Sequence, residues 1–302
     1  MVIYIMNSKN TDKNIDNGEK LIKSEADTKC APTFTFTDGS CIPLDIIIKI
    51  AKNYNKTSNC KIKLDNTMEV LQPKKYKKYL VNELNKAFPD CKNQACWLDK
   101  LDKIGNKYQE KLKDRIFRPI GPQGKFEWLN TININQVMNQ YTDKYKDFLF
   151  LGAVPIDFYE INAYKIKDLN YKDLLNEGIS KLGIVFNLDD HTQPGSHWVS
   201  GLIDLKNGNI YYYDSYGTRP GKRVREFYHK IANFMSNELG IKPNIEYNKK
   251  RHQYKDSECG MFSMHFIISL LDGEDFESFC NSQINDDDVN KLREEYFIIK
   301  KK

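Results

Sequence analysis

The chain lacks any apolar run long enough to cross a lipid bilayer, and it contains little glycine and proline. Its longest apolar-rich stretches, Phe148–Phe158 and Met261–Leu271, are far shorter than the roughly 20 residues that a membrane helix needs. Only 16 Gly and 10 Pro occur among 302 residues, which excludes collagen-like and low-complexity classes. The apolar start is too short for a secretory signal and follows no basic segment, so we expect an intracellular location.

A regular arrangement of cysteines is also missing. The seven are Cys30, Cys41, Cys60, Cys91, Cys96, Cys259 and Cys280. An odd number at irregular spacing is a poor disulfide framework, and no Cys-x-x-Cys pair occurs. Cys91 and Cys96 have no nearby histidine, so we expect no zinc site. Most of these cysteines are expected to be small buried apolar residues, and the remaining question is whether one is a nucleophile.

Charge is present in both signs but is unevenly distributed. Residues 1–120 contain 23 Lys and Arg against 15 Asp and Glu, a net charge of +8, whereas residues 121–302 contain 23 against 26, a net of −3. This asymmetry indicates two regions with different roles. We predict a mobile polar lead-in over residues 1–29, a basic and mainly helical N-terminal arm domain over 30–116, and the core domain over 117–302. The Pro- and Gly-rich segment Phe117–Gly124 is the expected joint.

In the basic region, apolar residues recur at three- and four-residue steps over Met68–Phe88, which predicts one helix that ends at Pro89. Its apolar side includes Val70 and Leu71, and four lysines lie around the opposite side: Lys74, Lys75, Lys77 and Lys78. A further helical stretch is expected over Cys96–Leu112. The lysines could contact phosphates or an acidic partner, or could simply form a solvated helix face.

Beyond residue 124 the pattern alternates between helices and short strands. The predicted strands are Leu182–Asn187, His197–Leu205, Ile210–Asp214 and Ile245–Tyr247, and an Asn-Gly turn joins the second to the third. The predicted helices are Asn135–Phe148, Val224–Leu239, Cys259–Leu271 and Asp286–Tyr296. Helices flanking an antiparallel or mixed sheet give an α+β fold class.

One combination of residues in this region points to nucleophilic catalysis. His197 opens a strand and Asp214 ends its hairpin partner, so a carboxylate can orient the imidazole. Cys259 begins a helix, where backbone N–H groups favour the thiolate, and a neighbouring histidine completes an active nucleophile. Gln253, six residues earlier, could hold an oxyanion together with the Cys259 N–H. Gly260 would let the backbone approach a substrate closely.

The segments HWVSGLIDL, YYYDSYG and Q-x5-CG, in this order, resemble the adenain and Ulp-type cysteine proteases. The resemblance implies a protease core with a central mixed sheet, in which His197 is the general base, Asp214 the orienting acid, Cys259 the nucleophile and Gln253 the oxyanion donor. It further implies that Trp198 shapes the substrate channel and that Asn187 is a polar substrate contact. From Phe117 to the C-terminus the sequence resembles the polyprotein-processing, SUMO-protease-like enzymes of large DNA viruses, of the African swine fever virus type. That branch carries Asn where this chain has Asp214.

The resemblance implies a cysteine endopeptidase that cleaves at Gly-Gly sites in viral structural polyproteins during virion maturation, without any cofactor. The expected locations are the host cytoplasm, the viral factory and the virion. Two alternatives stay open. The chain could be an isopeptidase that removes SUMO-like or ubiquitin-like proteins, which also end in Gly-Gly. It could instead be a binding module with an inactive protease site, whose basic residues 1–120 contact nucleic acid or an acidic partner.

Overall fold

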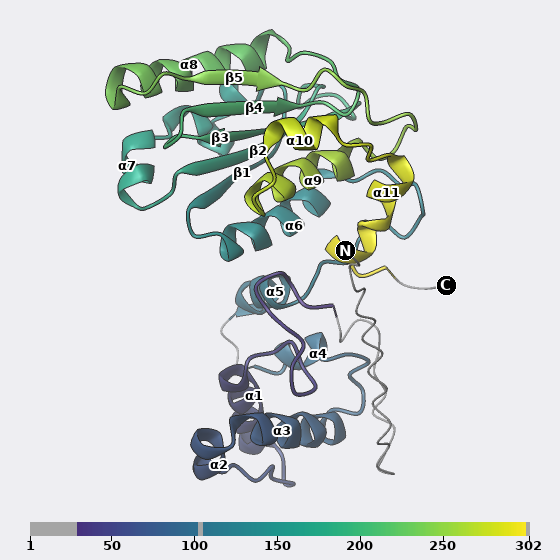
Figure 1. Ribbon diagram of the computed structural model, residues 1–302. Helices are drawn as coiled ribbons and strands as arrows, with labels where there is room; N and C mark the ends of the chain where they lie inside the picture. The colour runs from purple at the N-terminus through teal and green to yellow at the C-terminus, as the bar shows by residue number, and fades with distance from the viewer. Residues whose placement is uncertain (1–28, 102–104, 300–302) are drawn as a thin grey trace, which may run out of the picture.

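The structure is a computed structural model that describes residues 29–101 and 105–299 (Figure 1). Nearly all of the predicted lead-in over residues 1–29 lies outside the described residues. None of the described helices is long and apolar enough to span a membrane. The described residues up to 116 form mainly helices, and the bounds of these helices are α1 Leu44–Thr57, α2 Asn66–Leu71, α3 Pro73–Ala87, α4 Ala95–Leu98 and α5 Gly105–Ile116.

A mixed five-stranded sheet is the centre of the rest of the molecule, with strand order β1-β2-β3-β4-β5. The strands are β1 Phe148–Pro155, β2 Lys181–Asn187, β3 Trp198–Asp204, β4 Asn209–Tyr213 and β5 Asn244–Tyr247. The outer pairs are parallel and the two inner pairings are antiparallel. The helices are α6 Thr131–Lys144, α7 Tyr171–Asn176, α8 Lys222–Leu239, α9 Cys259–Leu271, α10 Phe276–Asn281, α11 Asp286–Lys291 and α12 Arg293–Tyr296, and the 3-10 helices are η2 Phe158–Glu160, η3 Asn162–Tyr164 and η4 Ile166–Asp168. The predicted α+β class is confirmed.

Strands β2, β3 and β4 are largely buried and carry apolar residues on both sides, whereas β5 is mostly exposed. In β3, Trp198 and Leu202 belong to the apolar cluster that contains α6 and α9, whereas Val199 and Ile203 pack with α8 on the opposite face. Helix α9, which packs against this sheet, is buried along most of its length and has almost no exposed surface. The nucleophile candidate at its first residue therefore rests on a rigid element in the core.

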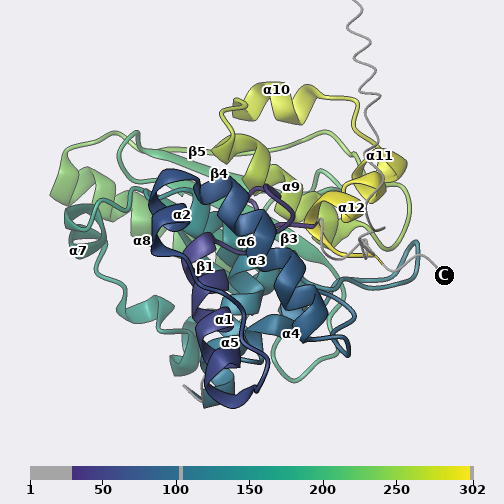
Figure 2. The ribbon, with the colours of Figure 1, turned by 90° about the horizontal axis from the view of Figure 1, so that it is seen from below.

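The N-terminal helices have a hydrophobic cluster of their own, formed by residues between Cys30 and Phe117. They gather below the sheet in Figure 1 and are seen from their own side in Figure 2. The expected joint after Ile116 is tightly packed: the Ile298 N–H donates to the carbonyl of Pro119, and the ring of Phe297 lies against Gly121. The division at residues 116 and 117 stays a proposal.

The structure corrects several expectations for the N-terminal region. The helix predicted over Met68–Phe88 is broken at Gln72, because Pro73 begins a new helix. Val70 and Leu71 therefore lie outside the apolar face and are 77% and 72% exposed. Lys77 is not part of a solvated face; it is buried, and its ammonium donates to the carbonyl of Ser40 at 2.9 Å. Only Lys74, Lys75 and Lys78 of this group are exposed.

In the core, the boundaries of three elements differ from the prediction. The helix expected over Asn135–Phe148 begins earlier, at Thr131, because Asn130 and Asn133 form a capping box. Phe148 starts β1, an edge strand that was missed because its sequence, FLFLGAVP, has no polar residue and therefore no two-residue alternation of apolar and polar residues. The last predicted helix is interrupted at Leu292, between α11 and α12.

The expectation that the cysteines do not form disulfides is wrong for four of them. Cys30 pairs with Cys41 and Cys91 with Cys96, while Cys60, Cys259 and Cys280 are free thiols. Both bridges lie within the N-terminal region and close short loops. Irregular spacing concealed them, because only the fold brings Cys30 next to Cys41 on the segment that leads into α1.

We predict that the protein, denatured without reductant, contains three reactive thiols. Replacing both Cys30 and Cys41 by Ser should lower the free energy of unfolding of the N-terminal region by about 2–3 kcal/mol, because closing a loop of this size restricts the unfolded chain. Thiol titration and urea unfolding monitored by Trp fluorescence measure the two quantities. Seven reactive thiols in the denatured protein would contradict the pairing, and Cys60→Ser is the control that should not affect stability.

Candidate active site

His197 and Asp214 lie at the same end of the β3–β4 hairpin, His197 just before β3 and Asp214 just after β4. Their side chains are buried, and the imidazole Nε2 lies 2.7 Å from the Asp214 Oδ1. A contact of this length between a carboxylate and a ring nitrogen fixes the orientation of the imidazole. The predicted pairing of these two residues is therefore present in the structure.

The Asp214 carboxylate is itself held by its surroundings. The Tyr216 N–H donates to its Oδ1 at 2.9 Å, and the chain turns because the Gly217 N–H donates to the Asp214 carbonyl. Gly217 has a φ of +74°, a conformation that glycine adopts without strain. From the far side, Asn248 accepts the Asp214 N–H through its Oδ1 and donates through its Nδ2 to the Asp214 carbonyl. Buried Asn248 thus fixes the backbone of the acid on both sides.

Cys259 is the first residue of α9, as the sequence predicts, and it is buried beside His197. Burial alone would lower the pKa of His197, but hydrogen bonds to Asp214 and Cys259 and the charges of both partners raise it to about 9. Because Nε2 of His197 is paired with Asp214, Nδ1 is the ring nitrogen that is left to interact with the Cys259 thiol. The arrangement can hold a thiolate–imidazolium pair.

The imidazole ring is also held by stacking. The ring of Tyr216 lies parallel to that of His197, with centroids 4.5 Å apart and an interplanar angle of 7°. The Arg251 guanidinium lies 4.9 Å from the Tyr216 centroid and the same distance from that of Tyr254. Contact across a full ring face restricts rotation of the imidazole out of the plane in which it meets Asp214.

Gln253 is fully buried, and its side-chain amide has a fixed orientation. Its Oε1 accepts from the Ser215 hydroxyl at 2.6 Å, and its Nε2 donates one proton to the carbonyl of Lys255 at 2.6 Å. The amide has two N–H donors, so the second remains for another acceptor. This geometry is compatible with the predicted role of Gln253 as an oxyanion donor, which stays a prediction.

Trp198 and Asn187 both line a pocket of about 380 Å³. Trp198 is largely buried, and its indole N–H donates to the carbonyl of Leu129 at 2.9 Å. The Oδ1 of Asn187 accepts from the N–H groups of Asp189 and Ser196 and so holds both ends of the loop that precedes His197. Asn187 therefore has a structural task besides any substrate contact that was predicted for it.

Gly260 has neighbours other than those expected. A Cβ at this position would lie 3.1 Å from Leu129 and 3.3 Å from the Trp198 ring. The missing side chain therefore lets two residues of the same chain pack against the start of α9. Close approach of a substrate to Gly260 stays a prediction, but the packing of Leu129 and Trp198 already leaves only a tight space for a Cβ here.

Sequence reasoning missed four residues that shape this site. Trp128 lines the same pocket as Trp198, and Leu129 anchors the Trp198 indole. Both could have been found from the sequence, because Trp128 and Leu129 are two large apolar residues directly before the helix cap at Asn130. Tyr216 could have been inferred from the tight Asp-Ser-Tyr-Gly turn. Asn248 has no local signal, because only the pairing of β4 with β5 brings it to Asp214.

Residues 162–301 match the model of the Ulp1 protease family, C-terminal catalytic domain. The chain is 34% identical over 284 residues to a protein of Acanthamoeba polyphaga mimivirus that is assigned as a thiol protease, and the match covers 89% of this chain and 92% of that protein. It is 26% identical over 197 residues to a cysteine protease of African swine fever virus, covering 61% and 72% of the two chains.

A solved structure with a similar fold is a crystal structure of the African swine fever virus protease. It superimposes with a TM-score of 0.61 at 19% identity, and the match covers 91% of this chain and 97% of that one. At this identity the likeness shows the fold. It extends over the N-terminal helices as well as the sheet, since most of both chains is aligned.

We predict that the raised pKa of His197 depends on Asp214. Asp214→Asn removes the negative charge and should lower the pKa of His197 by about 1–3 units. Because this pKa lies above the ordinary value of 6.5, the ion pair stabilises the fold fully below pH 6.5 and is lost as the pH rises through about 9. NMR titration of labelled histidines, assigned with His197→Gln, measures the change. An unchanged pKa in Asp214→Asn would overturn the pairing, and the exposed His191 serves as the internal control.

Proposed function

This chain belongs to the Ulp1-type family of cysteine proteases, and we propose that it is an endopeptidase that cuts viral structural polyproteins at Gly-Gly sites, with His197, Asp214, Cys259 and Gln253 as its catalytic set. The observation that carries the proposal is the buried His197–Asp214 pair beside a cysteine at the start of a buried helix. The charge of Cys259 also helps to raise the pKa of His197, so the three groups needed to activate a thiol act on one another.

The reaction follows from these contacts. The Cys259 sulfur attacks the carbonyl carbon of the scissile peptide, a C–S bond forms, and the C–N bond breaks as the His197 imidazolium gives its proton to the leaving amine. Water then attacks the thioester, His197 accepts a proton from that water, and the thiolate leaves with the carboxylic acid product. Asp214 keeps the imidazole oriented through both steps and stabilises its charged form.

Two donors would stabilise the oxyanion of each tetrahedral intermediate. The Cys259 N–H lies in the first turn of α9, where backbone N–H groups have no partner within the helix. The second N–H of the Gln253 amide is the other donor, because the first is held by the carbonyl of Lys255. Donors that are already fixed need no reorganisation when the charge develops.

Preference for glycine is supported by the crowded approach to Cys259. Leu129 and Trp198 already pack against Gly260, and Trp128 and Trp198 line the adjoining pocket. A substrate backbone that lies between these walls leaves little space for a Cβ next to the scissile bond, and only glycine lacks one. The same argument applies to polyprotein sites and to ubiquitin-like tails.

Polyproteins are favoured over ubiquitin-like conjugates by the N-terminal region. The two relatives described above are viral enzymes, and the match with the mimivirus protein extends over 89% of this chain, including helices outside the catalytic domain. We place the activity in the host cytoplasm, the viral factory and the virion on that ground. Exposed Lys74, Lys75 and Lys78 give the N-terminal helices a basic surface suited to an acidic partner or nucleic acid.

We predict that Cys259→Ala abolishes cleavage while leaving the fold intact, because no other group of the catalytic set can form the thioester. Wild type and Cys259→Ala are incubated with the polyprotein of the same virus, with a SUMO fusion and with a short Gly-Gly peptide, and the cut sites are read by mass spectrometry. Residual activity above about one part in a thousand would contradict the nucleophile assignment. Turnover of the SUMO fusion equal to that of the polyprotein would overturn the preference for polyproteins.

We predict that Gln253→Ala lowers kcat by about 10²- to 10³-fold with little change in KM, because its amide is needed only when the oxyanion forms. Steady-state kinetics on a fluorogenic Gly-Gly peptide measure both constants. Gln136→Ala is the matched control, since the Gln136 amide bonds to Asp114 on the surface, away from the catalytic residues. A change in KM alone would mean that Gln253 serves in substrate binding.

A further inference from the structure

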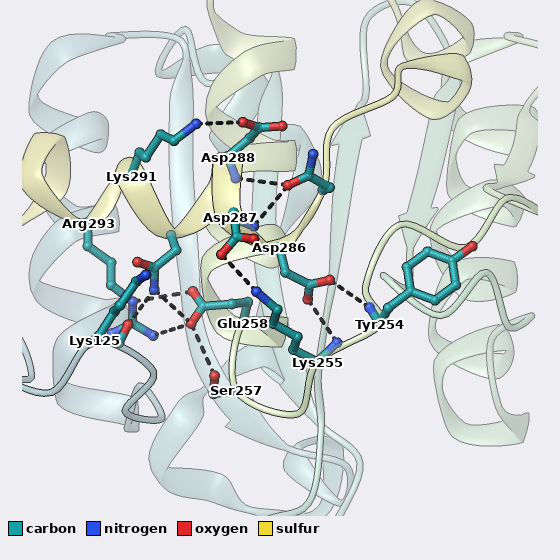
Figure 3. Close-up of polar contacts among 12 residues, drawn as sticks. Lys125, Tyr254, Lys255, Ser257, Glu258, Asp286, Asp287, Asp288, Lys291 and Arg293 are labelled. Atoms are coloured by element: carbon teal, nitrogen blue, oxygen red, sulfur yellow. Dashed lines mark hydrogen bonds and ion pairs between the residues drawn. The ribbon is translucent and has the colours of Figure 1, made fainter.

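The segment between Gln253 and Cys259 carries both proposed oxyanion donors, one at each end, and it has no regular secondary structure. Its shape therefore has to be set by contacts with other parts of the chain. The C-terminal segment that contains α11 and α12 provides a group of such contacts, and they are drawn in Figure 3. Three charged side chains in these contacts are almost fully buried: Glu258, Asp286 and Arg293.

Asp286 holds the first half of the segment. Its Oδ2 accepts the Tyr254 N–H at 2.8 Å and its Oδ1 accepts the Lys255 N–H at 3.1 Å, so one carboxylate binds two successive peptide groups (Figure 3). Asp286 is 4% exposed, although the Tyr254 side chain is 71% exposed. A buried carboxylate with two charge-assisted hydrogen bonds fixes the backbone that it binds, whatever the mobility of the side chains outside.

The position of Lys255 decides where the Gln253 amide points. The carbonyl of Lys255 accepts one proton of the Gln253 Nε2, and Ser215 binds the opposite end of the same amide. Since the amide is planar, fixing one N–H and the carbonyl oxygen also fixes the direction of the second N–H. Asp286 thus acts on Gln253 through the backbone of Lys255.

Glu258 and Arg293 hold the second half of the Gln253–Cys259 segment. The guanidinium lies 3.0 Å from the Glu258 Oε1, and its Nη2 also donates to the carbonyl of Glu127. Asn290 and Ser257 complete the contacts of the Glu258 carboxylate. Burying two charges costs desolvation free energy, which offsets much of their attraction. We therefore take the Glu258–Arg293 pair to select one conformation of the chain more than to stabilise the fold. Here the fixed conformation is that of the residue directly before Cys259.

We propose that Asp286 and the Glu258–Arg293 pair are positioning residues, which hold the Gln253–Cys259 segment in the shape that aims both oxyanion donors. This inference rests on the proposed function for its kinetic expectation. It assigns a catalytic purpose to the C-terminal helices, which lie outside the motifs that carry the chemistry. The residues act through the backbone and do not touch the substrate.

The test compares two neighbouring substitutions of identical chemistry, Asp286→Asn and Asp287→Asn. An asparagine at 286 would offer one oxygen and one NH₂ group to two N–H donors, so one of the two bonds is lost and a repulsive contact replaces it. Asp287 is exposed and binds the Lys255 ammonium at 2.8 Å, a type of surface pair that contributes little. Asp287→Asn therefore reports the effect of removing a charge at the same place.

On a fluorogenic Gly-Gly peptide, Asp286→Asn should lower kcat by about 10- to 100-fold with KM within a factor of about three, while Asp287→Asn leaves both unchanged. The rate of Cys259 alkylation by iodoacetamide should stay near the wild-type rate in both variants, because the His197–Cys259 pair is intact. Hydrogen exchange of the Tyr254 and Lys255 amides should accelerate only in Asp286→Asn.

Unchanged kcat in a folded Asp286→Asn variant would overturn the proposal, and so would an equal loss of kcat and alkylation rate, which indicates a merely structural role. If Asp286→Asn does not fold, Arg293→Lys is tested instead. Lysine keeps the positive charge but lacks the forked guanidinium that reaches both Glu258 and Glu127. A lower kcat with an unchanged rate of Cys259 alkylation is then expected. Failure of the wild type on the Gly-Gly peptide would contradict the proposed substrate instead, and amide exchange would still decide the role of Asp286.

Discussion

The hydrogen bond between the His197 imidazole and the Asp214 carboxylate is the constraint on which the rest of the site depends. Both groups are buried, and a buried charge is stable only when its partners are fixed. The surroundings meet that requirement from three sides: Tyr216 supplies a backbone N–H and a ring face, Asn248 holds the Asp214 backbone, and Cys259 supplies the second partner of the histidine. The β3–β4 hairpin brings the pair together, and the remaining contacts prevent it from moving.

Much of this site follows from sequence because its chemistry lies on elements with strong local signals. A strand, an Asn-Gly turn and a second strand place His197 beside Asp214, and an apolar helix that opens at Cys259 supplies the nucleophile. The α+β class follows from the alternation of helical and strand patterns along the chain, and the bounds of α9 follow from its largely apolar run. Each of these inferences needed only residues that are near in sequence or paired across one hairpin.

The rest could not be predicted because it depends on contacts between distant segments. Asn248 reaches Asp214 only through the pairing of β4 with β5, and Asp286 binds the backbone next to Gln253 although the two lie far apart in sequence. The two disulfides are local, with sequence separations of 11 and 5, and they were missed because an odd number of irregularly spaced cysteines does not indicate which of them pair. Lys77 was misassigned because periodicity does not reveal a buried carbonyl that accepts its ammonium. The prediction that Val70 and Leu71 lie on the apolar face of one long helix is wrong for a local reason. Pro73 starts a new helix, and the residues before it are turned outward.

These long-range contacts also explain how the N-terminal region is joined to the catalytic residues. The joint at Pro119 and Gly121 packs on Phe297 and Ile298, directly after α12. Arg293, at the start of α12, binds both Glu258 beside the nucleophile and the carbonyl of Glu127 beside Trp128. The pocket wall at Trp128, the segment before the nucleophile and the joint therefore share one buried support. Because closely packed groups shift together rather than singly, a displacement of the N-terminal helices would reach the catalytic residues through this support.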